Sequence, residues 1–331
     1  MAEFMGEIMG RSLEPEVARY DVSIVIVSWN TREILRDCLT SISQQTHASH
    51  EVIVVDNAST DGTQGMLKEE FPAITLIANT ENVGFAAANN QGLEIAKGTK
   101  LLLLNPDTII LDGAIDRMIC WLDKHPDVGC VGCQVWEDET TIQHTCFADP
   151  HPLNLAIGEF NLYRLARWVP MFGRTEYTGW ERTETRTVDV VSGMFMLVPR
   201  AVFEAVGPMD EAFFVYSEEA DWCRRIRNAG WRCVFAPEAR ILHLDGGSKS
   251  TVQIRSRMYV QMQKSKTIYV RKHYGRIGEL SARTVFVVGA LMRGTVFGVL
   301  GLVRPGAEAK AKIRLAKAAL VYHLAGQEPV S

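Results

Sequence analysis

The chain has 331 residues, of which 47% are hydrophobic and 22% are charged. These proportions are typical of a folded globular protein and exclude disordered, collagen-like and disulfide-scaffold proteins. Seven cysteines are sparse and odd in number, which favours a reduced, cytosolic chain. The net charge of −4 is unevenly distributed. From Lys249 onward the chain carries 15 basic and 3 acidic side chains, whereas the first 248 residues carry 20 basic and 36 acidic ones.

Residues 1–20 contain four glutamates and no long apolar run. We therefore expect an N-terminal extension without a cleavable export signal. The longest apolar stretch is Thr284–Val303, which has about the 20 residues needed to cross a bilayer. Arg293 lies at its centre, where a charge costs at least ~2.5 kcal/mol on insertion scales. This stretch is therefore expected to be embedded in a membrane or to lie at its surface.

Short β-branched runs alternate with helical patterns through the first 250 residues. Strands are expected at 21–28, 51–55, 74–78, 100–104 and 128–135, within 187–199, and at 233–235. Helices are expected from Asn30, where Glu33 completes a capping box, at 85–96, at 111–125, and within 213–227, where Ser217 is the expected N-cap. The alternation predicts an α/β fold, with a mostly parallel sheet covered by helices on both faces.

Ligands bind such sheets outside the carboxyl ends of the strands. Three of these ends carry polar, turn-forming residues, at 28–30, 56–61 and 105–107. The topology therefore predicts that the three segments converge on one edge.

Two of these segments offer oxygen ligands. Asp107 follows a leucine-rich strand beside Asn105, and a carboxylate in this position can hold a divalent cation that bridges two phosphates. Asn-Pro-Asp is equally a good turn. Asp56 could accept a hydrogen bond from a pyrimidine N–H, with nearby hydroxyls on a ribose, although Asx turns and a helix cap explain the same residues.

Acidic residues gather where the helix after Ser217 is expected to begin. The acids are Glu218, Glu219 and Asp221, and their number is larger than a favourable interaction with the helix dipole requires. One of them could therefore be a general base held by a rigid helix end. His243 could complete a metal site with Asp107, or could be structural. Cys130 and Cys133 form a CxxC without a second pair and are better explained as buried strand residues than as zinc ligands.

In chain order, these motifs resemble those of the family 2 glycosyltransferases, and within them the rhamnosyltransferase-like members. The matching stretches are SIVIVSWN at 23–30, VVDNASTDGT at 54–63, ENVGFAAANNQG at 81–92, LLLNPDT at 102–108, GPMDEAFFVYSEEADWCRR at 207–225 and the region of His243. The resemblance covers roughly residues 22–250. It implies a GT-A (Rossmann-like) fold at 21–249, a nucleotide-sugar donor, Mg²⁺ or Mn²⁺, and inversion at the anomeric carbon.

The resemblance also implies roles for individual residues. Glu219 matches the catalytic base, although it is one methylene longer than the common Asp, and Glu218 and Asp221 remain alternatives. Asp107 and His243 match metal-binding positions, and Asn105 stands where the first Asp of a DxD motif is common. The donor-binding positions are Ser28, Asn30, Asp56, Asn57, Asn82, Gly84 and Asn105. The acceptor-side positions are Gly193, Glu218 and Asp221.

Residues 250–331 are expected to form a basic and apolar helical extension. An apolar stretch between basic helices suits an anionic membrane surface better than nucleic acid. We therefore expect peripheral or monotopic attachment at the cytoplasmic face of the membrane, close to a polyprenyl-diphosphate-linked acceptor.

The expected function is transfer of a sugar from a nucleotide-diphosphate donor to a hydroxyl of a glycan or lipid-linked glycan, in cell-envelope polysaccharide synthesis. The resemblance favours dTDP-rhamnose as the donor. Two alternatives remain: a nucleotidyltransferase, and a non-catalytic nucleotide-sugar-binding partner of another transferase. The sequence does not identify the acceptor, the linkage or the oligomeric state.

Overall fold

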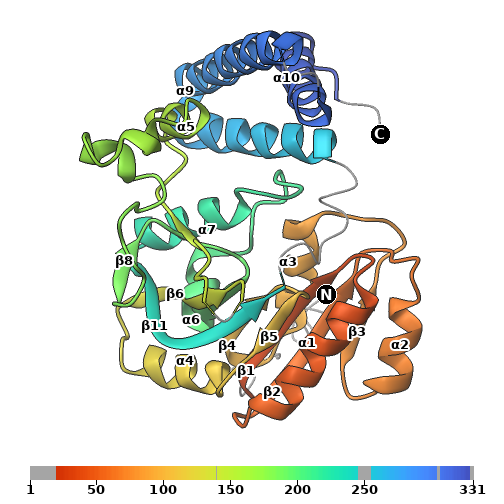
Figure 1. The fold of residues 1–331 in the computed structure, drawn as a ribbon. Coiled ribbons are helices and arrows are strands. Elements are labelled where there is room, and N and C mark those ends of the chain that lie inside the picture. Colours follow the sequence, from red (N-terminus) through yellow and green to blue (C-terminus); the bar gives the residue numbers. More distant parts are fainter. Residues whose placement is uncertain (1–19, 139, 245–254, 304–305, 329–331) are drawn as a thin grey trace, which may run out of the picture.

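The computed structural model describes residues 20–138, 140–244, 255–303 and 306–328. A mixed sheet with its covering helices forms one lobe, and α9 and α10 form a second, helical lobe beside α5 (Figure 1). The expected division at 1–20, 21–249 and 250–331 stays a prediction, since residues 1–19 and 245–254 lie outside the described residues.

The large sheet has the strand order β3-β2-β1-β4-β10-β6-β11-β5, and β8 pairs with β11. Its strands are β1 (Tyr20–Ser28), β2 (His50–Asp56), β3 (Thr75–Ala78), β4 (Gly98–Leu104), β5 (Thr108–Ile110), β6 (Val128–Trp136), β8 (Arg186–Val188), β10 (Phe195–Pro199) and β11 (Arg232–His243). A separate antiparallel pair joins β7 (Cys146–Phe147) to β9 (Val190–Val191). The expected α/β fold is confirmed, but the sheet is mixed: β1 to β4 are parallel, whereas β10, β5 and β8 run antiparallel to their neighbours.

The helices before α9 pack against this sheet, except α5, which packs against α9. They are α1 (Arg32–Gln45), α2 (Thr63–Glu70), α3 (Phe85–Ile95), α4 (Ala114–Asp123), α5 (Pro152–Glu159), α6 (Arg200–Val206) and α7 (Glu218–Asn228), with the 3₁₀ turns η1 (Leu162–Leu165) and η2 (Pro170–Gly173). Side chains of α1, α2 and α4 share one apolar cluster with the sheet. Side chains of α3, α6 and α7 share the other cluster. Cys130 and Cys133 are buried apolar strand residues, as expected.

One expected helix cap is wrong, and the other lies at the expected residue. α1 begins at Arg32 after Thr31, and Asn30 lies outside it, because its Oδ1 accepts a hydrogen bond of 2.8 Å from the backbone N of Thr60. Ser217 occupies the N-cap position of α7, but its φ is +70° and its side chain makes no capping hydrogen bond. The stretch 187–199 contains most of β8, the short strand β9, and β10.

The helical lobe begins with α9 (Arg255–Val303), which is interrupted at Gly275, where φ is +70° and ψ is −165°. We call residues 255–274 α9N and residues 276–303 α9C. Tyr259 of α9N hydrogen-bonds Arg293 of α9C, so the two parts lie side by side. α10 (Ala307–Ala325) packs through Ala316 and Ala319 against Ala290 of α9C and Tyr259 of α9N. By length and composition, α9 alone among the described helices could cross a membrane.

Candidate active site

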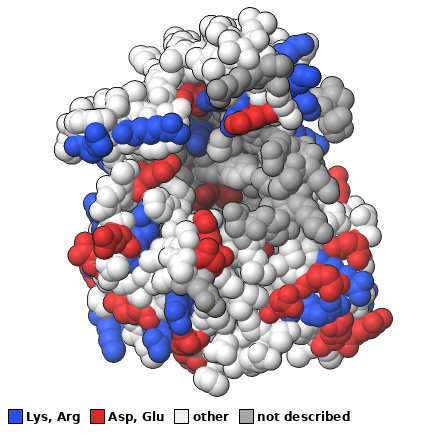
Figure 2. All heavy atoms as spheres, viewed as in Figure 1, with Lys and Arg blue, Asp and Glu red and all other residues white. Residues whose placement is uncertain are grey.

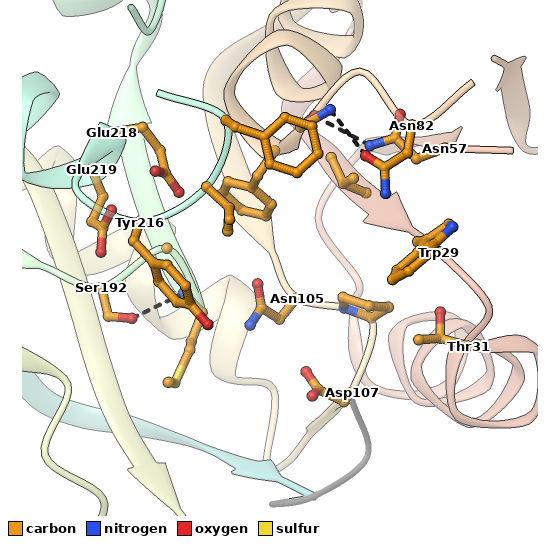
Figure 3. A pocket seen from close by; sticks show the side chains of 18 of the residues that line it. Trp29, Thr31, Asn57, Asn82, Asn105, Asp107, Ser192, Tyr216, Glu218 and Glu219 are labelled. Atoms are coloured by element: carbon orange, nitrogen blue, oxygen red, sulfur yellow. Dashed lines mark hydrogen bonds between the residues drawn. The ribbon is translucent and has the colours of Figure 1, made fainter. Parts of the chain in front are cut away.

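A cavity of about 400 Å³ opens at the carboxyl ends of β1, β2 and β4 (Figure 3). Its volume lies in the usual range for small-molecule sites. Nine of the expected site residues line it: Asn57, Asn82, Gly84, Asn105, Asp107, Gly193, Glu218, Glu219 and His243. Ser28, Asn30, Asp56 and Asp221 are not among the lining residues.

The end of β1 and the segment after it hold Thr31, which lines the cavity. Ser28 is buried, and its Oγ lies 2.9 Å from Oγ1 of Thr31, which does line the cavity. Asn30 is exposed, and its Oδ1 accepts a hydrogen bond from the backbone N of Thr60 in the segment after β2. Ser28 and Asn30 thus shape the loop rather than face the cavity.

Asp56 ends β2 and is fully buried. Its Oδ2 accepts hydrogen bonds from the backbone N of Ser59 at 3.1 Å and from Nε2 of Gln64 at 2.7 Å. Its Oδ1 has no hydrogen-bond partner. A buried carboxylate oxygen without a partner is costly, so a hydrogen-bond donor that reached this atom would be favoured.

The loop after β2 and the segment before α3 are connected to the loop before α7 through Gly84. Nδ2 of Asn57 donates to the Gly84 carbonyl at 3.2 Å, and the Gly84 N–H donates to Oδ1 of Asn82 at 3.0 Å. The φ of Gly84 is +91°, and a Cβ there would lie 2.5 Å from the carbonyl oxygen of Phe214. Only glycine fits this close approach, which places the segment before α3 against the loop that leads to Glu218.

Asp107 and His243 meet because β5 pairs antiparallel with the end of β11. Nε2 of His243 lies 3.2 Å from Oδ1 of Asp107, and both residues are 7% exposed. The Leu244 N–H donates to the Asp107 carbonyl at 2.9 Å and fixes this pairing.

These two side chains fit a divalent cation. Neighbouring ligands of an octahedral Mg²⁺ lie about 3 Å apart, which is close to the observed separation. Among the described residues, no group of three or more His, Cys, Asp or Glu side chains is arranged to hold a metal ion. Mg²⁺ is commonly bound by one or two carboxylates together with substrate phosphates, so a third protein ligand is not required for such a site.

Glu218 and Glu219 begin α7 after two residues, Tyr216 and Ser217, whose φ values are both +70°. Consecutive left-handed residues other than glycine are uncommon and form a sharp turn that holds the helix end. One carboxylate oxygen of each glutamate, Oε2, is buried without a hydrogen-bond partner.

Burial raises the pKa of both carboxyl groups of this pair. Burial raises the pKa of Glu219 to about 7. Burial, followed by the charge of Glu219, also holds the pKa of Glu218 well above its usual range. A carboxyl group with a pKa near neutrality is suited to accept a proton from a substrate.

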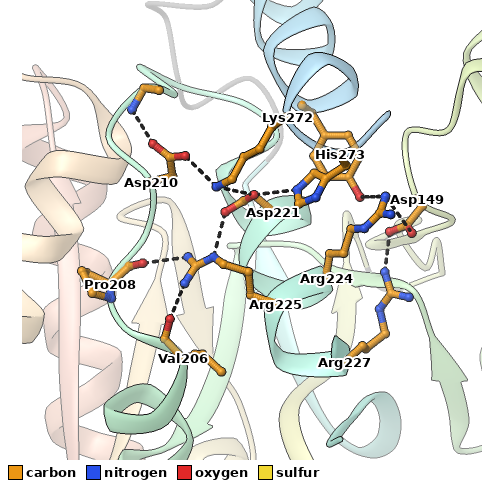
Figure 4. Close-up of polar contacts among 12 residues, drawn as sticks. Asp149, Val206, Pro208, Asp210, Asp221, Arg224, Arg225, Arg227, Lys272 and His273 are labelled. Carbon is orange, nitrogen blue, oxygen red and sulfur yellow. Dashed lines mark hydrogen bonds and ion pairs between the residues drawn. The ribbon is translucent and has the colours of Figure 1, made fainter. Parts of the chain in front are cut away.

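Asp221 does not line the cavity, and it joins α7 to α9 (Figure 4). Its carboxylate lies 2.7 Å from Nε2 of His273, 2.8 Å from Nζ of Lys272 and 2.9 Å from Nε of Arg225. Hydrogen bonds from these three groups outweigh the effect of burial and lower the pKa of Asp221 to about 2. It therefore remains ionised and is poorly suited to accept a proton.

Sequence reasoning missed several residues of the cavity. Trp29, Phe214 and Tyr216 line it, and the aromatic residues just before Glu218 were an available signal. Met258 also lines it, although it belongs to α9N. Nothing in the sequence near Met258 marks that position.

Comparison with known proteins identifies the family of this chain. Residues 23–207 match the model of glycosyl transferase family 2. The chain is 28% identical over 236 residues to N-acetylglucosaminyl-diphospho-decaprenol L-rhamnosyltransferase of Mycobacterium tuberculosis, covering 66% of this chain and 75% of that protein.

Two further similarities support the family and the fold. The chain is 30% identical over 240 residues to the O-antigen biosynthesis protein RfbC of Myxococcus xanthus, which covers 69% of this chain but 18% of that protein. A mannosyltransferase from Pyrobaculum calidifontis, solved with GDP-Man and Mn²⁺, superposes with a TM-score of 0.53 at 20% identity, over 94% of this chain and 88% of that one. The chain belongs to glycosyl transferase family 2 and is a glycosyltransferase with the GT-A fold.

Proposed function

We propose that the protein is an inverting, metal-dependent glycosyltransferase that moves rhamnose from dTDP-rhamnose to a hydroxyl of a glycan or lipid-linked glycan in cell-envelope synthesis. The observation that carries the proposal is that the Asp107–His243 pair and the Glu218–Glu219 pair line one cavity. In such a cavity the first pair can meet the diphosphate of the donor, and the second pair can accept a proton from the hydroxyl of the acceptor.

The donor is proposed to bind along the ends of β1, β2 and β4. The free Oδ1 of Asp56 would accept a hydrogen bond from the ring N–H of thymine, and Asn57, Asn82 and Asn105 offer hydrogen bonds nearby. The similarity to an L-rhamnosyltransferase supports rhamnose as the transferred sugar.

Asp107 and His243 would hold Mg²⁺ or Mn²⁺ at the diphosphate. When bound, the cation neutralises the charge that develops on the departing nucleotide diphosphate. The mannosyltransferase from Pyrobaculum calidifontis, solved with Mn²⁺, supports the choice of a divalent ion.

Glu219 is proposed as the general base. Its carboxylate removes the proton of the acceptor hydroxyl as that oxygen bonds to the anomeric carbon and the bond from this carbon to the diphosphate oxygen breaks. Attack from the face opposite the diphosphate inverts the anomeric centre. General-base catalysis of this kind contributes about 10²–10⁴ in rate.

The acceptor is proposed to enter beside Gly193 and Glu218. Glu218 is more deeply buried than Glu219 and would hydrogen-bond the acceptor rather than take its proton. A polyprenyl-diphosphate-linked acceptor would place the protein at the cytoplasmic face of a membrane, and Met258 connects the cavity wall to the helical lobe.

The test is release of nucleotide diphosphate from a panel of nucleotide sugars, with and without Mn²⁺, by wild type, Asp107→Asn and the control Asp112→Asn. Asp112 pairs with Arg240 at the surface and does not line the cavity. We expect metal-dependent turnover of dTDP-rhamnose by wild type and the control only.

Two results would contradict the proposal. Nucleotide binding without turnover, even with membrane lipid extract as the acceptor source, would make the protein a non-catalytic partner of another transferase. Pyrophosphate release from a nucleoside triphosphate would make it a nucleotidyltransferase.

A further inference from the structure

The helical lobe exposes large apolar side chains on two segments. On α9C they include Leu291, Val296, Val299 and Leu302, of which Leu302 is 85% exposed. The second segment is the η1–η2 projection, residues 162–174, where Leu165, Trp168 and Met171 are exposed, Trp168 by 63%. Exposed apolar patches of this kind mark interaction surfaces.

The two segments are neighbours in space. Glu159, the last residue of α5, forms an ion pair of 2.8 Å with Arg293 in the middle of α9C. A Cβ at Gly289 would clash with Cγ of Glu159, so the end of α5 lies directly against α9C. The η1–η2 projection follows α5 within three residues and extends from the same lobe (Figure 1).

Arg293 is turned into the protein and not toward the exposed face of α9C. Its guanidinium contacts Glu159 and the hydroxyl of Tyr259. If α9C crossed a bilayer alone, this half-buried ion pair would have to separate and leave a charge in hydrocarbon. With the pair intact, α9C presents its apolar face to a membrane surface and keeps its other face on the protein.

The η1–η2 projection has the charge that an anionic surface requires. Arg164, Arg167 and Arg174 are exposed, and Figure 2 shows basic side chains along this part of the helical lobe. The one carboxylate between residues 152 and 174 is Glu159, which is paired with Arg293. The guanidinium of Arg167 stacks 3.9 Å above the Trp168 ring. Arginine beside tryptophan suits the headgroup level of a bilayer.

We propose that the η1–η2 projection and the exposed face of α9C form one monotopic docking surface for an anionic membrane. The inference rests on the proposed function in one respect: docking at the membrane would bring the cavity to a lipid-linked acceptor. Vesicle binding can be measured without any sugar transfer, so the two proposals fail separately.

The test is co-flotation of the full-length protein with vesicles of phosphatidylcholine alone or mixed with phosphatidylglycerol. We expect binding mainly to the anionic vesicles. A basic residue near such a surface is worth about 1 kcal/mol, so replacing Arg164, Arg167 and Arg174 by Gln is expected to weaken binding roughly 100-fold. Trp168→Ala combined with Met171→Ala is expected to weaken it about tenfold or more.

Matched controls come from the sheet lobe. Ile95→Ala removes an exposed apolar side chain there, and Lys68→Gln with Lys124→Gln removes exposed charges. These controls should bind vesicles as wild type does, and all variants should keep the wild-type thermal midpoint. Wild-type vesicle binding by the variants of the η1–η2 projection would overturn the proposal, as would equal binding to neutral and anionic vesicles.

Discussion

Nε2 of His273 lies 2.7 Å from Oδ1 of Asp221, and this contact joins α9 to the helix that begins with Glu218 and Glu219. Lys272 reaches the same oxygen at 2.8 Å, and Arg225 holds the other one. Asp221 is one helical turn beyond Glu218, so the helical lobe is attached to the element that holds the proposed base. The position of α9 and the geometry of the cavity are therefore coupled.

Asp221→Asn is expected to destabilise the fold by about 3 kcal/mol at pH 7, because it removes the buried carboxylate charge that pairs with Arg225 and Lys272. The lowered pKa of Asp221, about 2, sets the sign of the pH dependence. Its contribution is complete above the ordinary carboxylate pKa near 4 and is lost as pH falls through about 2. Urea unfolding at several pH values measures this contribution.

The control for this experiment is Asp127→Asn, which breaks an exposed ion pair with Arg232. Exposed pairs contribute about 0–1 kcal/mol. If both variants lost the same small amount at pH 7, Asp221 would not be the anchor of α9.

Glu219→Gln is expected to lower kcat by about 10²–10⁴ while nucleotide affinity stays at the wild-type value. Because the pKa of Glu219 is raised to about 7, the kcat of the wild type should increase with pH as the pair loses its proton near neutrality. Steady-state kinetics from pH 5 to 9, with binding measured by calorimetry, test both statements. Normal turnover by Glu219→Gln, together with loss of turnover by Glu218→Gln, would transfer the role to Glu218.

Glu219→Gln is also expected to stabilise the folded protein at alkaline pH, relative to wild type. A carboxyl group whose pKa is raised by burial favours the folded state while it is protonated, and that stability is lost as pH rises from about 4.5 toward 7. The amide of Glu219→Gln carries no charge, so the variant should keep its stability where wild type loses it. Thermal midpoints at pH 5 and pH 8 measure the difference, and an equal fall in both proteins would contradict the argument. A loss of folding stability of this kind is common where activity requires a strained or buried charge.

The sequence was sufficient for much of the fold because its signals are local. β1, β2 and β4 are runs of buried Val, Ile and Leu, and the polar residues that follow them were expected to converge. Asn57 and Asn105 do line one cavity. Helix periodicity likewise identified α3 and α4 within a few residues of their observed bounds.

Long-range pairing explains what the sequence did not reveal. The last strand was expected only at 233–235, but β11 continues through an irregularity between Phe235 and Arg240 and carries His243 to Asp107. Asp221 stands two residues after Glu219, yet the phase of α7 turns it toward α9. No local pattern distinguishes an acid that faces a cavity from one that faces another helix.

Asp56→Asn is expected to change the base that the cavity prefers. Oδ2 of Asp56 accepts two hydrogen bonds, so the amide oxygen of the variant should take this position and its NH₂ group the position of Oδ1. A donor would then face the N–H of thymine, and binding of thymidine diphosphate should fall about 10- to 100-fold. Cytosine has an acceptor at the corresponding ring nitrogen, so cytidine diphosphate should lose less affinity or gain some. Calorimetry with both nucleotides measures the ratio, and Asp61→Asn, an exposed change in the same loop, should leave it unaltered. An equal loss for both nucleotides in Asp56→Asn would show that Asp56 shapes the loop without contacting the base.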